Sequence, residues 1–311
     1  MEDVALIAVV VATRDRPLRL RWLLNALDEQ THRDFQLVVA HNSSGPETEA
    51  LLRERGVQHL ELSPGLGPAA LRNAAWRACD APLVLFTDDD CRPPPDWIAR
   101  AADAAARHPG AIVQGATHPD PDELGVFHHS PHARSQQIEP PHVMAQTCNI
   151  LYPREVLERV GGFDESFPQA VGEDTDLALR ARATGAEFAA APEVLTYHAV
   201  EWGLARRVRG AWRWQHMALL VRKHPALRRE LPLGGWAWKA AHGRLLLLLA
   251  GLVLRRPWLA LPWLLGTPLT YGRHPRALAR TALELPGRAV LDGVETAALL
   301  RGSVRHRSLL L

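Results

Sequence analysis

The stretch VALIAVVVA, residues 4–12, decides the fold. It is an almost unbroken run of apolar and largely β-branched residues, typical of a strand that is buried on both faces. The run ends at the polar segment TRDRP (13–17), after which leucines recur at helical spacing between Leu18 and Leu27. Strand, loop and helix therefore follow one another at the start of the chain.

The same alternation returns three times in the next hundred residues. Apolar runs at 35–40, 57–62 and 82–87 each precede an amphipathic stretch, near residues 47–55, 68–79 and 96–108. This pattern predicts an α/β fold, with a mostly parallel, Rossmann-like sheet flanked by helices. Because ligands bind at the carboxyl ends of such strands, we expect the loops 13–17, 41–45 and 88–95 to lie at one edge.

The periodicity stops between His118 and His142, in a stretch rich in Pro and His. A loop of this length in a compact domain is usually functional or mobile, so we expect it to be one of the two. The pattern then resumes with an apolar run at 148–152, helices at 154–160 and 174–184, and strands at 187–190 and 194–198.

Composition and charge set the broad class of the protein. The 311 residues are 47% hydrophobic and 23% charged, which excludes wholesale disorder. Three cysteines form no even framework, and the Met1-Glu2-Asp3 start lacks the pattern of a signal peptide, so we expect a cytoplasmic, reducing location. Residues 1–202 carry a net charge of −13 and residues 203–311 a net charge of +15. We therefore predict two domains, the second basic, Trp-rich and helical.

The most informative polar cluster is Asp88-Asp89-Asp90, which directly follows the apolar run 83–86. Three adjacent carboxylates repel one another unless a cation compensates them. Mn²⁺ and Mg²⁺ prefer hard oxygen ligands and commonly bridge to substrate phosphates, so the cluster indicates a divalent metal site. The alternative is a merely polar turn before a helix that begins near Asp96.

Two further features complete the candidate site. Asp174 lies at the start of a predicted helix in GEDTDL (172–177), where a carboxylate is well placed as a general base. The helix macrodipole alone would also favour acids at this position. His198 ends a short apolar strand, and it is either a structural histidine or, beside an acidic site, a metal ligand.

The order and spacing of these motifs resemble the inverting family 2 glycosyltransferases of GT-A fold. The resemblance covers roughly residues 4–200 and rests on the following segments: ATRDRP (12–17), Arg72-Asn73, FTDDDCRPPPDW (86–97), TCNI (147–150), GGFDE (161–165), GEDTDLALR (172–180) and His198. It implies a nucleotide-sugar half at about residues 1–115 and an acceptor and base half at about residues 116–202.

The resemblance also implies roles for individual residues. Asp174 would be the catalytic base, and Asp90 with His198 would hold Mn²⁺ or Mg²⁺. The implied donor-binding residues are Thr13, Arg14, Arg16, Asn42, Arg72, Asp88 and Asp89. Asn42 follows the second strand, where the family commonly has an Asp that reads the nucleobase. UDP-, GDP- and dTDP-sugars therefore all stay open as donors.

These residues point to transfer of a sugar onto an acceptor hydroxyl, and several other functions fit less well. A sugar nucleotidyltransferase should have a Gly-rich loop after the first strand, and segment 13–17 has no glycine. A processive synthase should have Gln where Gly210 precedes Arg213-Trp214, so we expect a non-processive enzyme. An inactive sugar-nucleotide-binding or scaffold protein at the membrane is the alternative. No nucleic-acid module is identifiable, and we expect no nucleic-acid partner.

The basic C-terminal part suggests a membrane partner. The apolar run 245–254 is ten residues long, about 15 Å as a helix, against a hydrocarbon core of about 30 Å. Joining it to run 258–265 would place Arg255 and Arg256 inside the membrane. We predict peripheral binding to an anionic surface, at the inner face of the cell membrane. Packing on the catalytic domain and formation of a homodimer are the alternatives. The acceptor would be lipid-linked, a cell-envelope glycan or a secondary metabolite.

Overall fold

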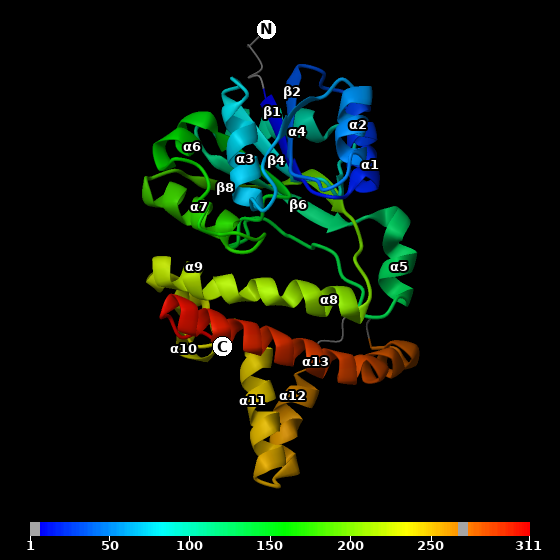
Figure 1. The fold of residues 1–311 in the computed structure, drawn as a ribbon, viewed down its shortest axis with the longest axis vertical. Coiled ribbons are helices and arrows are strands. Elements are labelled where there is room, and N and C mark those ends of the chain that lie inside the picture. Colours follow the sequence, from blue (N-terminus) through cyan, green and yellow to red (C-terminus); the bar gives the residue numbers. More distant parts are fainter. Residues whose placement is uncertain (1–6, 267–272) are drawn as a thin grey trace. The chain divides into compact units, whose positions relative to one another are not determined.

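The computed structural model describes residues 7–266 and 273–311, which form two compact units. Unit 1 comprises residues 7–124 and 135–200, and unit 2 comprises residues 125–134 and 201–311. The second unit thus takes a short segment from the loop 118–142 in addition to the C-terminal part. Figure 1 shows the elements of both units. The division of the first part near residue 115 stays a prediction.

Unit 1 is built on one eight-stranded sheet with the strand order β3-β2-β1-β4-β7-β6-β8-β5. The strands are β1 (Ile7–Thr13), β2 (Phe35–His41), β3 (Gln58–Glu61), β4 (Leu83–Asp88), β5 (Cys91–Arg92), β6 (Ile112–Pro119), β7 (Asn149–Pro153) and β8 (Phe188–His198). Parallel pairing joins β3, β2, β1 and β4 in series, and also joins β6 to β8. The α/β class with a mostly parallel sheet is therefore confirmed.

Two strands make the sheet mixed. The strand β7 runs antiparallel to both β4 and β6, and β5 runs antiparallel to β8. The two strands expected at 187–190 and 194–198 are one strand, β8, which pairs with β6 across a register shift at Gly115/Ala116. Pro192 lies in the skipped segment of β8, and it has no N–H to donate to the ladder.

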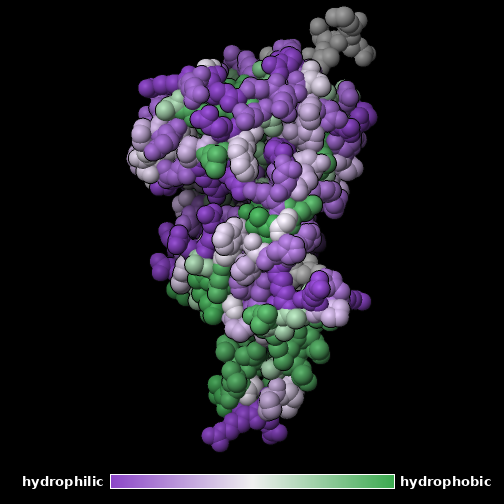
Figure 2. Space-filling view, turned by 90° about the vertical axis from the view of Figure 1, so that its right-hand side faces the viewer, coloured by the Kyte–Doolittle hydropathy of each residue, from purple (hydrophilic) through white to green (hydrophobic). Residues whose placement is uncertain are grey.

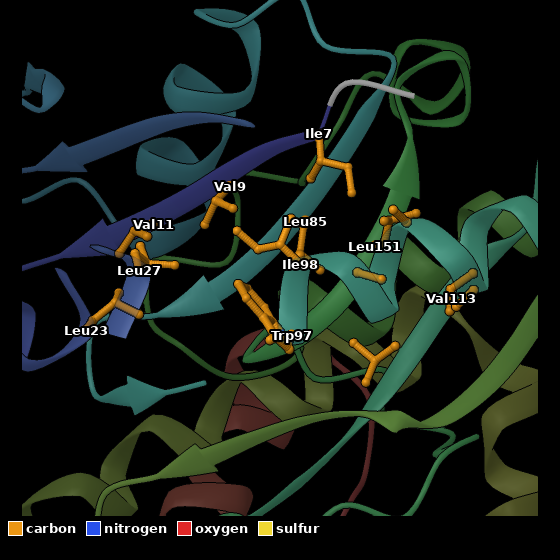
Figure 3. Close-up of a cluster of buried hydrophobic side chains, with 14 of the residues drawn as sticks. Ile7, Val9, Val11, Leu23, Leu27, Leu85, Trp97, Ile98, Val113 and Leu151 are labelled. Carbon is orange, nitrogen blue, oxygen red and sulfur yellow. The ribbon is translucent and has the colours of Figure 1, made fainter. Parts of the chain in front are cut away.

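Helices cover the sheet of unit 1 on both faces. They are α1 (Pro17–Asp28), α2 (Glu47–Glu54), α3 (Pro68–Arg77), α4 (Trp97–Arg107), α6 (Arg154–Val160) and α7 (Glu173–Ala183). Side chains of β1 alternate between two cores: Ile7 and Val9 join one, and Ala8 joins the other, all fully buried. Figure 3 shows the first core, where Trp97 and Ile98 of α4 pack beside β1 and β4. This explains the unbroken apolar run at the start of the chain.

The segment between His118 and His142 has more structure than the sequence predicts. It contains the short 3₁₀ helix η1 (Pro121–Glu123) and the helix α5 (Leu124–His129). Isolated bridges also pair Thr117 with Ile138 and Arg134 with Glu201. These elements are too short to leave a periodic signal, which is why the sequence reads as an open loop.

Unit 2 is helical, as the C-terminal extension was expected to be. Its elements are α8 (Leu204–Ala211), η2 (Trp212–His216), α9 (Met217–Lys223), η3 (Pro225–Glu230), α10 (Pro232–Gly235), α11 (Ala240–Val253), η4 (Pro257–Ala260), α12 (Leu261–Leu265) and α13 (Pro275–His306). The long helix α13 packs along α8, η2 and α9, with Gly302 against the backbone of Gln215. Among the described residues, no helix combines the length and the apolar character that crossing a membrane requires.

Candidate active site

The candidate site lies where β1, β2 and β4 end. Because these strands are parallel and in register, Ala12 lies beside Asp88, and Thr13 lies beside His41. The loops that follow the three strands therefore share one edge of the sheet, as expected for a ligand site. The N-terminus of α7 and the end of β8 supply the remaining candidate residues.

The three acids of the triplet 88–90 have different neighbours. Asp88 and Asp90 form one cluster with His198, in which one potential ligand atom of each residue lies within 4.8 Å of the others. The His198 Nε2 lies 3.3 Å from Asp90 Oδ1. Residues so far apart in sequence meet because β5, directly after the triplet, pairs Cys91 with His198 of β8. The structure thus groups Asp88 with the two residues that the sequence predicts as metal ligands.

The donor set of this cluster fits a divalent cation. The His198 Nδ1 lies 2.9 Å from the Ala199 carbonyl oxygen, which is the partner of an Nδ1–H donor. In this tautomer the Nε2 lone pair faces Asp90 and is available to a metal. Two carboxylates and one neutral imidazole nitrogen are ligands that Mn²⁺ accepts readily, and the carboxylates suit Mg²⁺ as well.

Asp89 has a different environment from its two neighbours. Its carboxylate is buried and accepts a 2.6 Å hydrogen bond from Thr13 Oγ1 and a 3.1 Å bond from Arg16 Nη1. Arg16 Nη1 also reaches Asp90 Oδ2 at 2.8 Å. Burial, reinforced by the nearby Asp90 charge, raises the pKa of Asp89 to about 7 against the effect of Arg16. Asp89 therefore ties the loop after β1 to the end of β4.

Arg72 of α3 connects the metal-ligand cluster with the acids of α7. Its Nη2 donates to Asp88 Oδ1 at 2.8 Å, and its Nη1 donates to Glu173 Oε1 at 2.9 Å. The Arg72 side chain is only 6% exposed, so both ion pairs lie away from bulk water. Glu173 lies in the segment GEDTDL, but nothing local in the sequence shows that a residue 101 positions earlier pairs with it.

The two acids at the start of α7 are both buried against Arg72. Burial, together with the adjacent Asp174, raises the pKa of Glu173 to about 8, while Arg72 opposes the shift. Burial also raises the pKa of Asp174 from its usual range. The Asp174 Oδ2 accepts a 3.3 Å hydrogen bond from the Thr147 backbone N–H. Burial therefore disfavours the ionised form of both acids, and the Arg72 guanidinium opposes this effect at both.

Two of the expected donor-binding residues, Asn42 and Arg14, make their contacts outside the acidic triplet 88–90. Asn42 is buried, and its Nδ2 donates to the Leu66 carbonyl oxygen at 2.9 Å, while its Oδ1 has no hydrogen-bond partner in the described chain. The exposed Arg14 lies 3.6 Å from Asp15. Asp15 in turn accepts hydrogen bonds from the backbone N–H and hydroxyl of Ser44, which joins the loops after β1 and β2.

Hydrogen bonds between Asn73 of α3 and the GGFDE loop (161–165) form a clamp that the sequence did not predict. Asn73 donates to the Phe163 carbonyl oxygen and accepts from the Phe163 N–H, both at 2.9 Å, and it also accepts from Trp76 Nε1 at 3.0 Å. Gly162 has a φ of +77°, and a Cβ there would lie 2.5 Å from Asn73 Oδ1. The clamp fixes the GGFDE loop on the helix that carries Arg72.

The sequence of the chain also matches a known protein family. Residues 8–161 match the family model described as glycosyl transferase family 2. The chain belongs to this family. The match includes the whole acidic triplet and Arg72, and it ends before α7 and His198.

The relatives of this family 2 glycosyltransferase include other glycosyltransferases. It is 30% identical over 212 residues to the O-antigen biosynthesis protein RfbC of Myxococcus xanthus. This alignment covers 58% of this chain and 16% of RfbC. It is 25% identical over 273 residues to a validoxylamine A glucosyltransferase of Streptomyces hygroscopicus subsp. jinggangensis. This alignment covers 73% of this chain and 63% of that protein. The chain spans less than two thirds of the length of each.

Solved structures show the same fold. The mannosyltransferase PcManGT of Pyrobaculum calidifontis, determined with GDP-Man and Mn²⁺, superposes with a TM-score of 0.58 at 23% identity over 97% of this chain and 86% of that chain. S. aureus TarS 1-349, determined with UDP-GlcNAc, superposes with a TM-score of 0.51 at 15% identity over 97% of this chain and 92% of that chain. The family 2 enzyme described here therefore has the GT-A fold.

Proposed function

We propose that this glycosyltransferase moves one sugar at a time from a nucleoside diphosphate sugar to an acceptor hydroxyl, with inversion and with the help of a divalent cation. The observation that carries the proposal is the pairing of two acidic groups through Arg72. Asp88, Asp90 and His198 lie on one side of Arg72, and Glu173 with Asp174 lie on the other. One group suits the leaving diphosphate, and the other suits the attacking hydroxyl.

Asp88, Asp90 and His198 are the residues that would hold the cation. When bound, Mn²⁺ or Mg²⁺ neutralises the negative charge that the leaving nucleoside diphosphate acquires. PcManGT, solved with GDP-Man and Mn²⁺, and TarS, solved with UDP-GlcNAc, support a nucleotide-sugar donor. Thr13, Arg14, Arg16 and Asn42 border the same edge of the sheet, and we assign them to binding of the donor, whose nucleotide is UDP, GDP or dTDP.

Asp174 is the base in this proposal. The acceptor oxygen attacks the anomeric carbon while its proton passes to the Asp174 carboxylate, and the bond to the diphosphate oxygen breaks with its electron pair. Attack opposite the leaving group inverts the anomeric centre. Glu173, whose pKa is raised to about 8, holds a proton at neutral pH and so lowers the negative charge around Arg72. The Arg72 guanidinium favours the ionised form of Asp174, against the effect of burial.

Only the names of the relatives indicate which kinds of acceptor to consider. An O-antigen biosynthesis protein supports a cell-envelope or lipid-linked glycan, and a validoxylamine A glucosyltransferase supports a small secondary metabolite. Both kinds of acceptor offer a hydroxyl to Asp174. The cytoplasmic location and the lack of processivity stay predictions from the sequence.

A panel of nucleotide sugars tests the proposal directly. Thermal shift of the purified protein with UDP-, GDP- and dTDP-sugars, with and without Mn²⁺, should identify one donor that stabilises the fold only when Mn²⁺ is present. Asp90→Ala should abolish this shift and leave the melting midpoint of the free protein within a few degrees, about the effect of 1 kcal/mol. Asp96→Ala is the matched control, because Asp96 is a half-exposed acid outside the cluster.

Three outcomes would contradict parts of the proposal. An unchanged Mn²⁺-dependent shift in Asp90→Ala would remove Asp90 from the metal site. A shift that is the same without metal would remove the cation. Donor binding without hydrolysis or transfer, across acceptors of both kinds, would favour the inactive sugar-nucleotide-binding protein.

A further inference from the structure

The helical hairpin formed by residues 240–265, comprising α11, η4 and α12, exposes an unusual amount of apolar surface. Ten of its large side chains are 38–83% exposed: Leu246, Leu247, Leu249, Leu252, Val253, Leu254, Trp258, Leu261, Leu264 and Leu265. Figure 2 shows the apolar surface covering the hairpin and a hydrophilic surface at its end. Contiguous apolar surface of this kind marks a contact with a partner or a membrane.

The charges of the hairpin are of one sign. Residues 231–266 contain Lys239, Arg244, Arg255 and Arg256, and no Asp or Glu. Arg255 and Arg256 lie in the exposed turn between α11 and η4. Unit 2 has five acids, and four of them already pair within it: Glu201, Glu284, Asp292 and Glu295. The hairpin therefore has no acid of its own to pair with the arginines of the turn. Anionic groups outside the chain would compensate their charge.

Both legs of the hairpin are anchored on α13 by buried polar contacts. At the start of α11, Lys239 Nζ and His242 Nε2 lie 2.7 Å and 3.1 Å from Glu295 Oε2. In α12, Trp263 Nε1 donates to Asp292 Oδ2 at 2.9 Å. These contacts fix the base, and most of the exposed apolar side chains, from Leu246 to Leu261, lie between the base and the turn. The apolar surface thus belongs to a hairpin that is anchored on α13 at both helices.

We propose that this hairpin lies in the interface of an anionic lipid bilayer, with the leucines of its lower side among the acyl chains and Arg255 and Arg256 at the lipid phosphates. The helix α11 has 14 residues, about 21 Å at 1.5 Å per residue, so the hairpin is too short to cross a hydrocarbon core of about 30 Å. Because the hairpin lies along the surface, the arginines of its turn stay at the level of the headgroups.

A second copy of the chain fits the hairpin less well than lipid does. Two hairpins packed against each other would bring like charges together, because the segment has no acid to pair with the partner's arginines. Anionic headgroups supply both the missing negative charge and the apolar phase beneath it. The proposal is independent of the sugar-transfer reaction, since it uses no residue of the candidate active site.

Flotation of the full chain with vesicles tests the insertion. The protein should float with phosphatidylcholine vesicles that contain phosphatidylglycerol, much less with phosphatidylcholine alone, and less in high salt. Leu252→Ser with Val253→Ser should lower the partition coefficient by more than about tenfold, because both side chains would leave the acyl phase. Arg255→Glu with Arg256→Glu should lower binding to the anionic vesicles by a similar factor.

The matched control lies on another helix of the same unit. Leu283→Ser with Val304→Ser removes two side chains of α13 that are 83% and 82% exposed, as the Leu252 and Val253 side chains are 70% and 82% exposed. This control should bind vesicles like the original protein. A polarity-sensitive dye on Leu252→Cys should shift to the blue with anionic vesicles, because the native cysteines are buried and stay unlabelled.

Several results would overturn the proposal. They are no flotation with anionic vesicles at low salt, equal binding to neutral vesicles, and equal losses in the hairpin variant and its α13 control. A dimer in light scattering that disappears in Leu252→Ser with Val253→Ser, without vesicle binding, would assign the hairpin to a second copy of the chain. Donor binding measured by thermal shift should be unchanged in every one of these variants.

Discussion

The two units of this glycosyltransferase place their unusual residues in opposite ways. Among the described residues, unit 1 exposes five large apolar side chains that lie on four separate segments, whereas unit 2 exposes twenty. Unit 1 instead buries charge: Arg72, Asp89 and Glu173 are each at most 5% exposed. Buried charge is costly unless a partner or ligand compensates it, and exposed apolar surface is costly unless something covers it. This difference agrees with the ligands proposed for the two units, a nucleotide sugar for unit 1 and a lipid surface for unit 2.

The largest effect that this comparison predicts is on catalysis in unit 1. Asp174→Asn should lower the rate of transfer on the order of 10²- to 10⁴-fold, because the amide cannot accept the proton of the acceptor hydroxyl. Donor binding by calorimetry should be retained, since Asp174 lies outside the metal-ligand cluster. Near-normal turnover would move the base to Glu173 or Asp176.

The next largest effect concerns stability. Arg72→Met should lower the free energy of unfolding of unit 1 by about 3–5 kcal/mol, because it leaves the Asp88 carboxylate without its cation and the buried Glu173 without its hydrogen-bond donor. Urea titration followed by circular dichroism measures the change. Arg100→Met breaks an exposed pair with Asp96 and should cost only about 0.3–0.5 kcal/mol. Equal losses in the two variants would show that the Arg72 pairs are no better buried than a surface pair.

A third prediction concerns pH. The pKa of Glu173 is raised to about 8 by burial, so from about pH 4.5 to about 8 the folded protein binds a proton that the unfolded chain has released. Stability from this group is thus present at low pH and is lost as the pH rises toward about 8. Its contribution to the slope is at most about 1.4 kcal/mol per pH unit.

Comparison with Glu173→Gln isolates this contribution. Glutamine does not titrate, so the free energy of unfolding of the variant should fall less steeply between about pH 5 and about pH 8. Asp89, whose pKa is also raised, contributes with the same sign to both proteins and cancels in the difference. Parallel curves for the two proteins would mean that Glu173 is ionised in the fold throughout this range.

The smallest predicted effect lies in unit 2. Leu252→Ala in the hairpin should change the free energy of unfolding by no more than about 0.5 kcal/mol, because the side chain is 70% exposed. Leu23→Ala in the fully buried core of unit 1 should cost about 2–5 kcal/mol. Urea titrations of both variants without lipid decide the matter. A loss above about 2 kcal/mol in Leu252→Ala would show that the hairpin surface is already covered in the isolated protein.

The sequence was informative wherever the deciding signal is local. The run 4–12, the acids that follow the strand ending at Asp88, and Asp174 at the start of a helix could all be located in advance. Side-chain periodicity is a property of neighbouring residues, and parallel strands bring their carboxyl ends to a common edge. For that reason the edge that holds the candidate site could be predicted without knowing the strand order.

Only the tertiary structure decided what depends on residues distant in sequence. The antiparallel direction of β7 and the pairing of β5 with β8 set Asp88 and Asp90 beside His198, and periodicity carries no information about strand direction. The ion pair between Arg72 and Glu173 joins residues 101 positions apart. The leucines of α11 show the same limit, because an apolar run reads alike whether the fold buries it or exposes it. Exposure is settled by which surfaces meet, and that is a property of the packed chain.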